Sequence, residues 1–254
     1  MKFILGLLFL VAGLAQAQTW PGKPVRVIVN VAAGGVADVT MRVLGARMQE
    51  TLGQPFVVEN RAGGDGYIGF DAVARADADG STLLYSPGSS MMIAPHIAVE
   101  VFNREAKVKT NHVPYKGAGP ALKDLLGGQI DFAFDPGVGL APAKAGKLRM
   151  IAIAGPARHP DFPDVPTLEE NGIKGVDGGP HFGLYAPSAT PKETILKINA
   201  EMLKAMQDPT VRDRFKALAV DVAEPMTPEQ FAAYVRGEHA RYAKLIPELG
   251  IKGQ

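Results

Sequence analysis

The chain of 254 residues contains no cysteine. Disulfide bridges, thiol catalysis and cysteine-ligated metals are therefore excluded, and stability has to come from burial, for which the chain is long enough. The sequence also lacks an excess of one charge, since 27 Lys and Arg residues face 26 Asp and Glu residues. A neutral chain has no broad field to attract polyanions, so we expect neither nucleic acid nor an anionic membrane surface as a partner.

Sequence motifs for common enzyme chemistry are missing as well. There is no G-x-S-x-G elbow, no glycine-rich loop ending in Lys-Ser or Lys-Thr, and no H-E-x-x-H. The five histidines are scattered without the close spacing of a metal site, and the acids form no pair that the sequence alone assigns to acid and base roles. We therefore expect a protein that is not an enzyme and that needs no metal or cofactor.

One glycine pattern raises the possibility of nucleotide binding, because Gly64-x-Gly66-x-x-Gly69 matches the dinucleotide-binding fingerprint letter for letter. In that fold the glycines follow the first strand directly, and an acid at the end of the next strand holds the ribose. Here Arg61-Ala62-Gly63 intervene, and residues 81–99 contain neither Asp nor Glu. The sequence thus disfavours nucleotide binding.

Long apolar runs are absent except at the N-terminus. Lys2 precedes an apolar run over residues 3–14, and Ala15-Gln16-Ala17 follows it. This order is typical of a secretory signal peptide, and the run is too short for a permanent membrane anchor. We predict a signal peptide over residues 1–17 and an exported, periplasmic mature chain that begins at Gln18.

The mature sequence begins with alternating strand and helix patterns. A β-branched apolar run at residues 25–31 predicts a buried strand, and helical spacing follows over residues 37–52. The pattern repeats with a strand over 56–58, a helix over 68–76 and a strand over 82–85. Such alternation predicts an α/β fold with a parallel sheet whose ligands lie at the carboxyl ends of the strands. At the first of these ends, Gly34 and Gly35 expose helix N-terminal amides that favour an anion.

A second series of helix and strand patterns follows after residue 96. It predicts helices over residues 97–106 and 118–126, strands over 110–114, 130–134 and 148–154, and an extended segment over 182–186. Thr167 and Glu170 predict a capping box, and Thr190-Pro191 and Thr227-Pro228 each predict a helix with Thr at the N-cap.

Many of these segments together resemble one family, the substrate-binding subunits of tripartite tricarboxylate transporters, also called Bordetella uptake gene solute receptors. The resemblance rests on nine segments in the family's order: Trp20-Pro21-x-Lys23-Pro24-Val25-Arg26, Gly34-Gly35-x-x-Asp38, Leu52-Gly53-Gln54-Pro55, Val58-Glu59-Asn60-Arg61, Asp79-Gly80-x-Thr82-Leu83-Leu84, His112-Val113-Pro114-Tyr115-Lys116-Gly117, Leu125-Leu126-Gly127-Gly128-Gln129, Gly146-Lys147-Leu148-Arg149 and Phe182-Gly183-Leu184-x-Ala186-Pro187. It implies a two-lobed periplasmic-binding-protein-like fold that closes around a small carboxylated solute and docks on a membrane permease.

The chain departs from the family near Pro95-His96-Ile97. Family members continue there through a strand, a helix and another strand to a second Gly/Ser-rich loop, whereas this chain passes straight into the helix that follows that loop. We therefore expect a truncated second lobe. The expected organisation is a signal peptide over 1–17, lobe 1 over 18–95, the truncated lobe 2 over 96–181, and a return to lobe 1 over 182–254.

The resemblance also implies the binding residues. The first glycine loop would hold the ligand carboxylate through backbone amides, with Asp38 ordering the loop rather than touching the anion. Ser89 would lie at the end of the third strand, His96 would stand for the histidine of one of the two joined sites, and Asp135 and Phe182 would line the opposite wall. The expected ligand-binding set is Ala33, Gly34, Gly35, Val36, Ala37, Asp38, Ser89, His96, Asp135 and Phe182.

The leading hypothesis is therefore a monomeric solute receptor for a small organic carboxylate, with permease subunits as its partners. Two alternatives stay open: an exported α/β enzyme acting in the same cleft, and a nonfunctional truncated paralogue. Because half of the carboxylate clamp is missing, we expect weak or absent binding, and missing central strands should leave apolar surface exposed in the second lobe.

Overall fold

The structure is a computed structural model, and it describes residues 20–87, 89–115, 117–155, 157–176, 182–218, 220 and 222–250, without the side chains of residues 65 and 89–96. The predicted signal peptide lies outside the described residues. Within them, no helix has both the length and the apolar character needed to cross a membrane.

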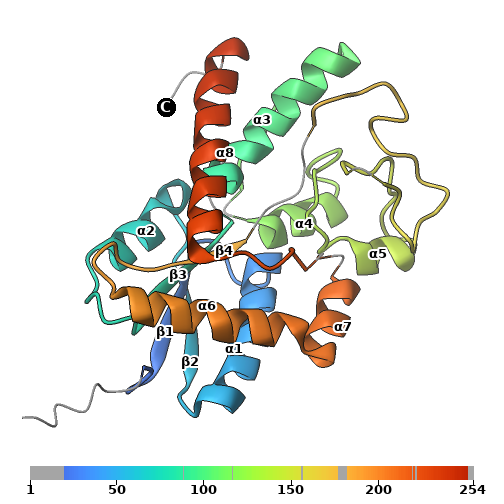
Figure 1. Cartoon of the computed structure of the whole chain (residues 1–254). Coiled ribbons are helices and arrows are strands. Elements are labelled where there is room, and N and C mark those ends of the chain that lie inside the picture. The colour runs from blue at the N-terminus through green and yellow to red at the C-terminus, as the bar shows by residue number, and fades with distance from the viewer. Residues whose placement is uncertain are drawn as a thin grey trace, which may run out of the picture.

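A four-stranded sheet organises the fold (Figure 1). Its spatial order is β2-β1-β3-β4, in which β1 pairs in parallel with β2 and β3, and β4 runs antiparallel to β3. The strands are β1 (Val25–Val29), β2 (Phe56–Asn60), β3 (Thr82–Ser86) and β4 (Gly183–Tyr185). The predicted alternation of parallel strands and helices in the first part of the chain is thus confirmed, and residues 183–185 return to the same sheet.

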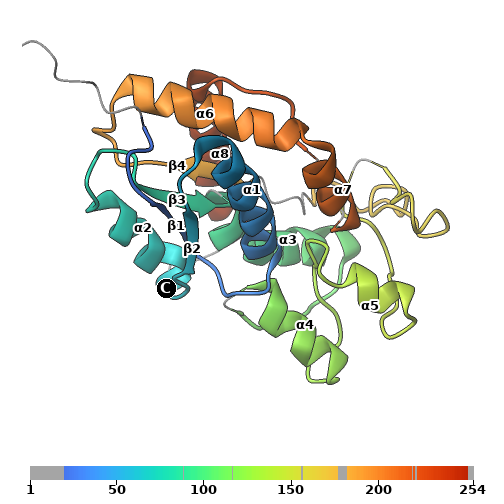
Figure 2. The same ribbon diagram turned by 90° about the horizontal axis from the view of Figure 1, so that it is seen from below.

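Helices cover both faces of this sheet (Figures 1 and 2). A short 3₁₀ turn, η1 (Gly64–Gly66), leads into the second of them. The helices are α1 (Val36–Leu52), α2 (Tyr67–Ala74), α3 (Ser89–Ala106), α4 (Ala118–Leu126), α5 (Leu140–Lys144), α6 (Lys192–Gln207), α7 (Pro209–Ala217) and α8 (Pro228–Glu248).

Strand alternation divides the core into two layers. Val27, Val29 and Tyr85 pack against α1, α6 and α7, where Met41 and Phe215 are buried with them. Residues of the opposite parity, Ile28 and Leu84, pack against Val73 and Phe70 of α2. The carboxyl ends of β1, β2 and β3 therefore open onto one edge between these layers.

The predicted helix caps can be compared directly with the structure. Thr227 is the N-cap of α8, as predicted, and forms a capping box with Gln230; Thr167 and Glu170 exchange the same pair of hydrogen bonds, as predicted. The prediction for Thr190 is wrong, because α6 begins one residue later, with Pro191 at its N-cap. Thr190 Oγ1 is buried without a hydrogen-bond partner among the described residues.

The structure departs most from the prediction between residues 97 and 154. Helix α4 matches its predicted range, but the predicted strands over 110–114, 130–134 and 148–154 are wrong: those residues are not strands, and only an isolated bridge joins Ile153 to Thr167. A strand needs a hydrogen-bonded neighbour, and among the described residues these segments have none beyond that bridge. Residues 130–134 instead lie against α3, where the rings of Phe102, Phe132 and Phe134 lie 5.9–6.5 Å apart.

Apolar side chains are correspondingly exposed in this part of the chain. Val108, Val113, Phe132 and Ile151 all expose more than a third of their surface, and Ile151 exposes 69%. Comparable exposure occurs elsewhere, for example at Tyr67 and Ile68, so open apolar surface is not confined to the part expected to form the second lobe.

Helix α3 begins earlier than predicted. It runs without a break from Ser89, directly after β3, to Ala106, whereas the sequence predicts a helix only from residue 97. Its second half packs against α8, where Ile97, Val101 and Tyr242 are buried together (Figure 1).

Candidate functional site

The loop between β1 and α1, residues 30–35, ends at the first turn of a 17-residue helix. Gly34 takes a left-handed backbone conformation at φ +82°, which glycine adopts without strain. Gly35 is the N-cap of α1, and no side chain caps the helix. The first intrahelical donor at this end is Val39 N–H, which bonds to Gly35 O. The amides of the first turn thus leave a local positive potential at the carboxyl edge of the sheet.

Asp38 holds this loop in place. Its carboxylate is 5% exposed, and Oδ2 accepts a hydrogen bond from Gly34 N–H at 2.9 Å. Oδ1 accepts a second bond from Arg42 Nε, also at 2.9 Å. Asp38 therefore orders the loop as expected, and its charge is paired with Arg42. The Gly34 N–H, which the sequence analysis assigns to the ligand, is bonded to Asp38 in this structure.

A chain of side chains extends this support to the neighbouring strand. Arg42 Nη2 donates to Asn60 Oδ1 at 3.1 Å, and Asn60 Nδ2 donates to the carbonyl of Val31 at 3.2 Å. The loop is thus held from both its ends, by the first turn of α1 and by the last residue of β2.

Helix α4 lies on the other side of the loop (Figure 2). A Cβ built on Gly119 would lie 3.5 Å from Ala33 O and 3.9 Å from Gly35 N, and one built on Gly117 would lie 3.5 Å from Ala32 N. Gly117 is the N-cap of α4, again without a side-chain cap. Two helix N-termini, each without a side-chain cap, therefore meet at residues 32–35.

The two residues expected on the opposite wall have other contacts. Asp135 accepts hydrogen bonds from the amides of Gly137 and Gly139, so its carboxylate organises its own turn. Gly137 lies against the carbonyl of Leu218, just after α7. Phe182 stacks on Tyr85, with ring centroids 5.6 Å apart, and packs on the core beside α1. The contacts of Asp135 thus lie within its own turn, and those of Phe182 lie in the core.

Ser89 and His96 both lie on α3, Ser89 at its first position and His96 about two turns further along. Their side chains lie outside the described part of the structure. Among the described residues, no group of three or more histidine or acidic side chains is arranged to hold a metal ion.

Two buried polar residues at the strand ends were not identified from the sequence. Asn30 follows β1 directly and is 3% exposed, and Ser86 ends β3 and is 0% exposed. Among the described residues, neither the Asn30 amide nor the Ser86 hydroxyl has a hydrogen-bond partner, which for a buried group costs about 1–3 kcal/mol. Their position after apolar runs on two predicted parallel strands was the signal that could have found them.

Buried polar contacts elsewhere near the site are satisfied. Thr40 Oγ1 donates to Val36 O at 2.7 Å and lies 3.1 Å from the Tyr85 hydroxyl. Burial raises the pKa of Tyr85 well above its ordinary value, although the bond to Thr40 acts in the opposite direction. Burial also raises the pKa of Tyr185 to about 12. Both tyrosines are thus neutral at physiological pH and add no charge to the site.

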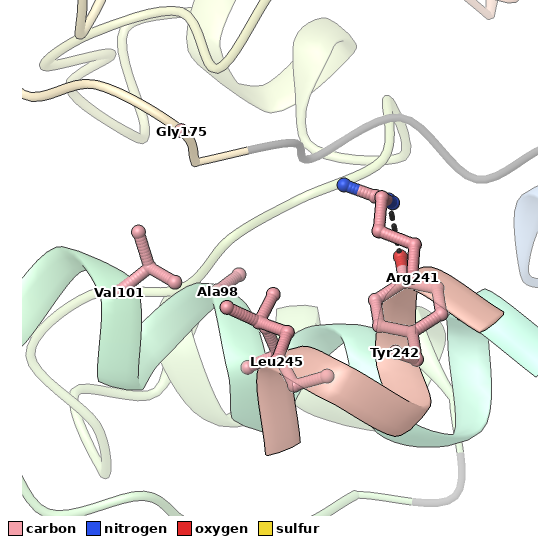
Figure 3. A pocket seen from close by; sticks show the side chains of 7 residues that line it. Ala98, Val101, Gly175, Arg241, Tyr242 and Leu245 are labelled. Carbon is pink, nitrogen blue, oxygen red and sulfur yellow. Dashed lines mark hydrogen bonds between the residues drawn. The ribbon is translucent and has the colours of Figure 1, made fainter. Parts of the chain in front are cut away.

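A shallow pocket lies between α3 and α8 (Figure 3). Val101, Leu245 and Tyr242 line it, and the Arg241 guanidinium at its rim is paired with Glu238 at 2.9 Å and bonds to the Tyr242 hydroxyl. Its lining is apolar and its one cation is already engaged, so it does not suit an anionic solute.

Comparison with known proteins places this arrangement in context. The sequence profile described as "tripartite tricarboxylate transporter family receptor" matches residues 40–101 and 85–251. The protein BugT of Bordetella pertussis is 31% identical over 320 aligned positions, covering 98% of this chain and 97% of BugT.

Solved structures agree with the fold. The periplasmic binding protein BugD is 27% identical, with a TM-score of 0.84, over 92% of this chain and 100% of BugD. MatC from Rhodopseudomonas palustris, solved with bound malate, is 26% identical, with a TM-score of 0.78, over 89% of this chain and 100% of MatC. The predicted α/β periplasmic-binding-protein-like fold is therefore confirmed.

The same comparisons support the expected truncation. The alignment to BugT has 320 positions against 254 residues in this chain, so at least 66 positions face a gap. The two profile matches also share residues 85–101, which include most of α3. Two segments of the family pattern thus converge on α3, where the sequence departs from the family.

Proposed function

Because the chain belongs to the tripartite tricarboxylate transporter receptor family, we propose that it captures a small organic carboxylate in the periplasm and presents it to the membrane subunits of such a transporter. Its relatives are periplasmic binding proteins, and MatC was solved with malate. The family consists of solute receptors, which confirms the prediction that the chain is not an enzyme. The alternative of an exported enzyme is thereby set aside.

The observation that carries the proposal is the meeting of two helix N-termini at residues 32–35. Amides at the start of α1 and of α4 both lack a side-chain cap, and each helix end carries a partial positive charge. The nearby carboxylate of Asp38 is paired with Arg42, so it opposes an incoming anion little. A ligand carboxylate would accept bonds from the Gly35 and Val36 amides, while Gly34 and Asp38 keep the loop in shape.

Lobe movement follows from the same contacts. Gly35 is buried and its nitrogen lies 3.9 Å from a Cβ built on Gly119 of α4, whereas Ala33 and Gly34 are exposed. In this proposal α4 moves away from the loop to admit the solute next to the Gly35 amide, and its return encloses the carboxylate. A ligand held by both helices favours the closed arrangement, which a permease can recognise.

The truncation sets the expected affinity. Each charge-assisted hydrogen bond contributes on the order of 1.5–3 kcal/mol, so the loss of two or three with the missing loop weakens binding by orders of magnitude. We therefore expect binding weaker than micromolar. Isothermal titration calorimetry of the purified protein with L-malate, followed by other dicarboxylates, tests this proposal.

Saturable heat at millimolar malate or a related acid supports a receptor. A folded protein that binds no carboxylate at these concentrations would favour the second candidate, a nonfunctional paralogue. The absence of the three predicted strands over residues 110–114, 130–134 and 148–154 also supports that candidate. Restoring the missing segment from a full-length relative then provides the control, since recovery of binding assigns the loss to the truncation.

A further inference from the structure

Asn30 and Ser86 are neighbours at the carboxyl edge of the sheet. The parallel register pairs Val29 with Tyr85, so the residues that follow them, Asn30 and Ser86, lie side by side. Both side chains have the parity of Ile28 and Leu84, which face α2. Two buried polar side chains thus share one face of the sheet at its ligand-binding edge.

Glycines and an aromatic ring surround this pair. A Cβ on Gly69 of α2 would lie 2.7 Å from Asn30 Cβ, so only glycine fits there without a shift. Ser86 pairs with Gly183 of β4, and the Phe231 ring lies against Gly183. None of these positions takes part in a salt bridge that the structure describes, and the Arg61 guanidinium nearby is paired with Glu59.

The unpartnered atoms have a defined chemistry. The Asn30 amide offers donors at Nδ2 and an acceptor at Oδ1, and the Ser86 hydroxyl can donate and accept. A carboxylate only accepts, so it would leave Asn30 Oδ1 without a donor. A hydroxyl donates and accepts, and it therefore complements both residues at once.

We propose that Asn30 and Ser86 form a neutral subsite that recognises a hydroxyl group of the solute, so that the preferred ligands are hydroxycarboxylates. This inference rests on the proposed function, with the carboxylate at the start of α1 and the hydroxyl at the strand ends. Asn30 begins the loop that leads to Gly35, so both parts of the ligand lie at one edge of the sheet.

Malate and succinate provide the test, because they share chain length and both carboxylates and differ by one hydroxyl. Calorimetry of the purified wild-type protein should show malate binding about tenfold more tightly than succinate, the usual effect of one well-placed hydrogen-bonding group. The variants S86A and N30L should lose this preference while retaining succinate affinity. Both should also melt at a higher temperature, because an unpartnered buried polar group is removed.

Thr190→Val is the matched control. Thr190 also has a buried hydroxyl without a partner among the described residues, but it follows β4, which runs antiparallel and away from the carboxyl edge. T190V should raise the melting temperature without changing the ratio of malate to succinate affinity. A wild-type ratio near one, or a ratio that survives in both S86A and N30L, would overturn the subsite while leaving the receptor proposal intact. Wild-type protein that binds neither acid would overturn the subsite, and titration with the other dicarboxylates would then decide the receptor proposal.

Discussion

The carboxylate of Asp38 lies 2.9 Å from the backbone nitrogen of Gly34, four residues earlier, and closes the loop between β1 and α1. The same carboxylate accepts a bond from Arg42 one helical turn later. One acidic side chain therefore sets the shape of the loop and has its own charge paired with Arg42, next to the positive end of α1.

Replacing Asp38 tests this support. D38A leaves the Gly34 amide without its acceptor and Arg42 without its partner, and should lower the free energy of unfolding by about 1–2 kcal/mol. Urea denaturation followed by circular dichroism measures the loss. D71A is the matched control, since Asp71 and Arg75 have the same spacing on an exposed helix surface and should contribute less than about 0.5 kcal/mol. Equal effects of the two substitutions would contradict a special role for Asp38.

The amide of Val36 can be removed without breaking the helix. Val36 is the first residue of α1, a position that proline favours, and Gly35 before it is already extended at φ −80° and ψ 168°. V36P should bind malate at least about tenfold more weakly than V36A, which also removes the valine side chain but keeps the amide. Calorimetry gives the affinities and thermal melts verify folding. Equal affinities would place the ligand carboxylate away from this amide.

Two glycines at the start of α4 should respond in opposite ways to alanine. Gly119 is helical, and its added Cβ would meet only ordinary contacts at 3.5 Å or more, so G119A should stabilise the protein by up to about 1 kcal/mol through helix propensity. Gly117 has φ +143°, a conformation that alanine adopts only with strain, so G117A should cost about 1–3 kcal/mol. Urea titrations of both variants test the seating of α4 on the loop. Strong destabilisation by G119A would mean that α4 packs more closely than described.

Buried tyrosines should limit stability at alkaline pH. Burial holds the pKa of Tyr85 above its ordinary value and raises that of Tyr185 to about 12. Above pH 10 the unfolded chain releases these protons and the folded chain keeps them, so the free energy of unfolding falls as pH rises. Y85F should make this decline shallower by about 1.4 kcal/mol per pH unit. Urea titrations at pH 8, 10 and 11 measure the slope, and Y67F, at a side chain that is 70% exposed, should leave it unchanged.

The first half of the fold could be predicted because its signals are local. The apolar run at β1, the helical spacing of Met41, Leu44 and Met48, and the glycine break between them each depend on residues close in sequence. The capping box of Thr227 and Gln230 likewise forms within one helical turn. The cap prediction for Thr190 was wrong although Thr190 is followed by proline just as Thr227 is. The local motif is the same at both helices, but α6 begins one residue later, with Pro191 at its N-cap.

The sequence by itself determined the α/β class, the parallel direction of the first three strands and the family to which the chain belongs, because periodicity and motif order need no tertiary contact. Only the tertiary structure decided that residues 110–114, 130–134 and 148–154 are not strands, since a strand depends on a neighbour elsewhere in the chain. Only the tertiary structure placed Asn30 beside Ser86 and Gly119 beside Gly35, because strand register and helix packing join residues that are more than 50 positions apart.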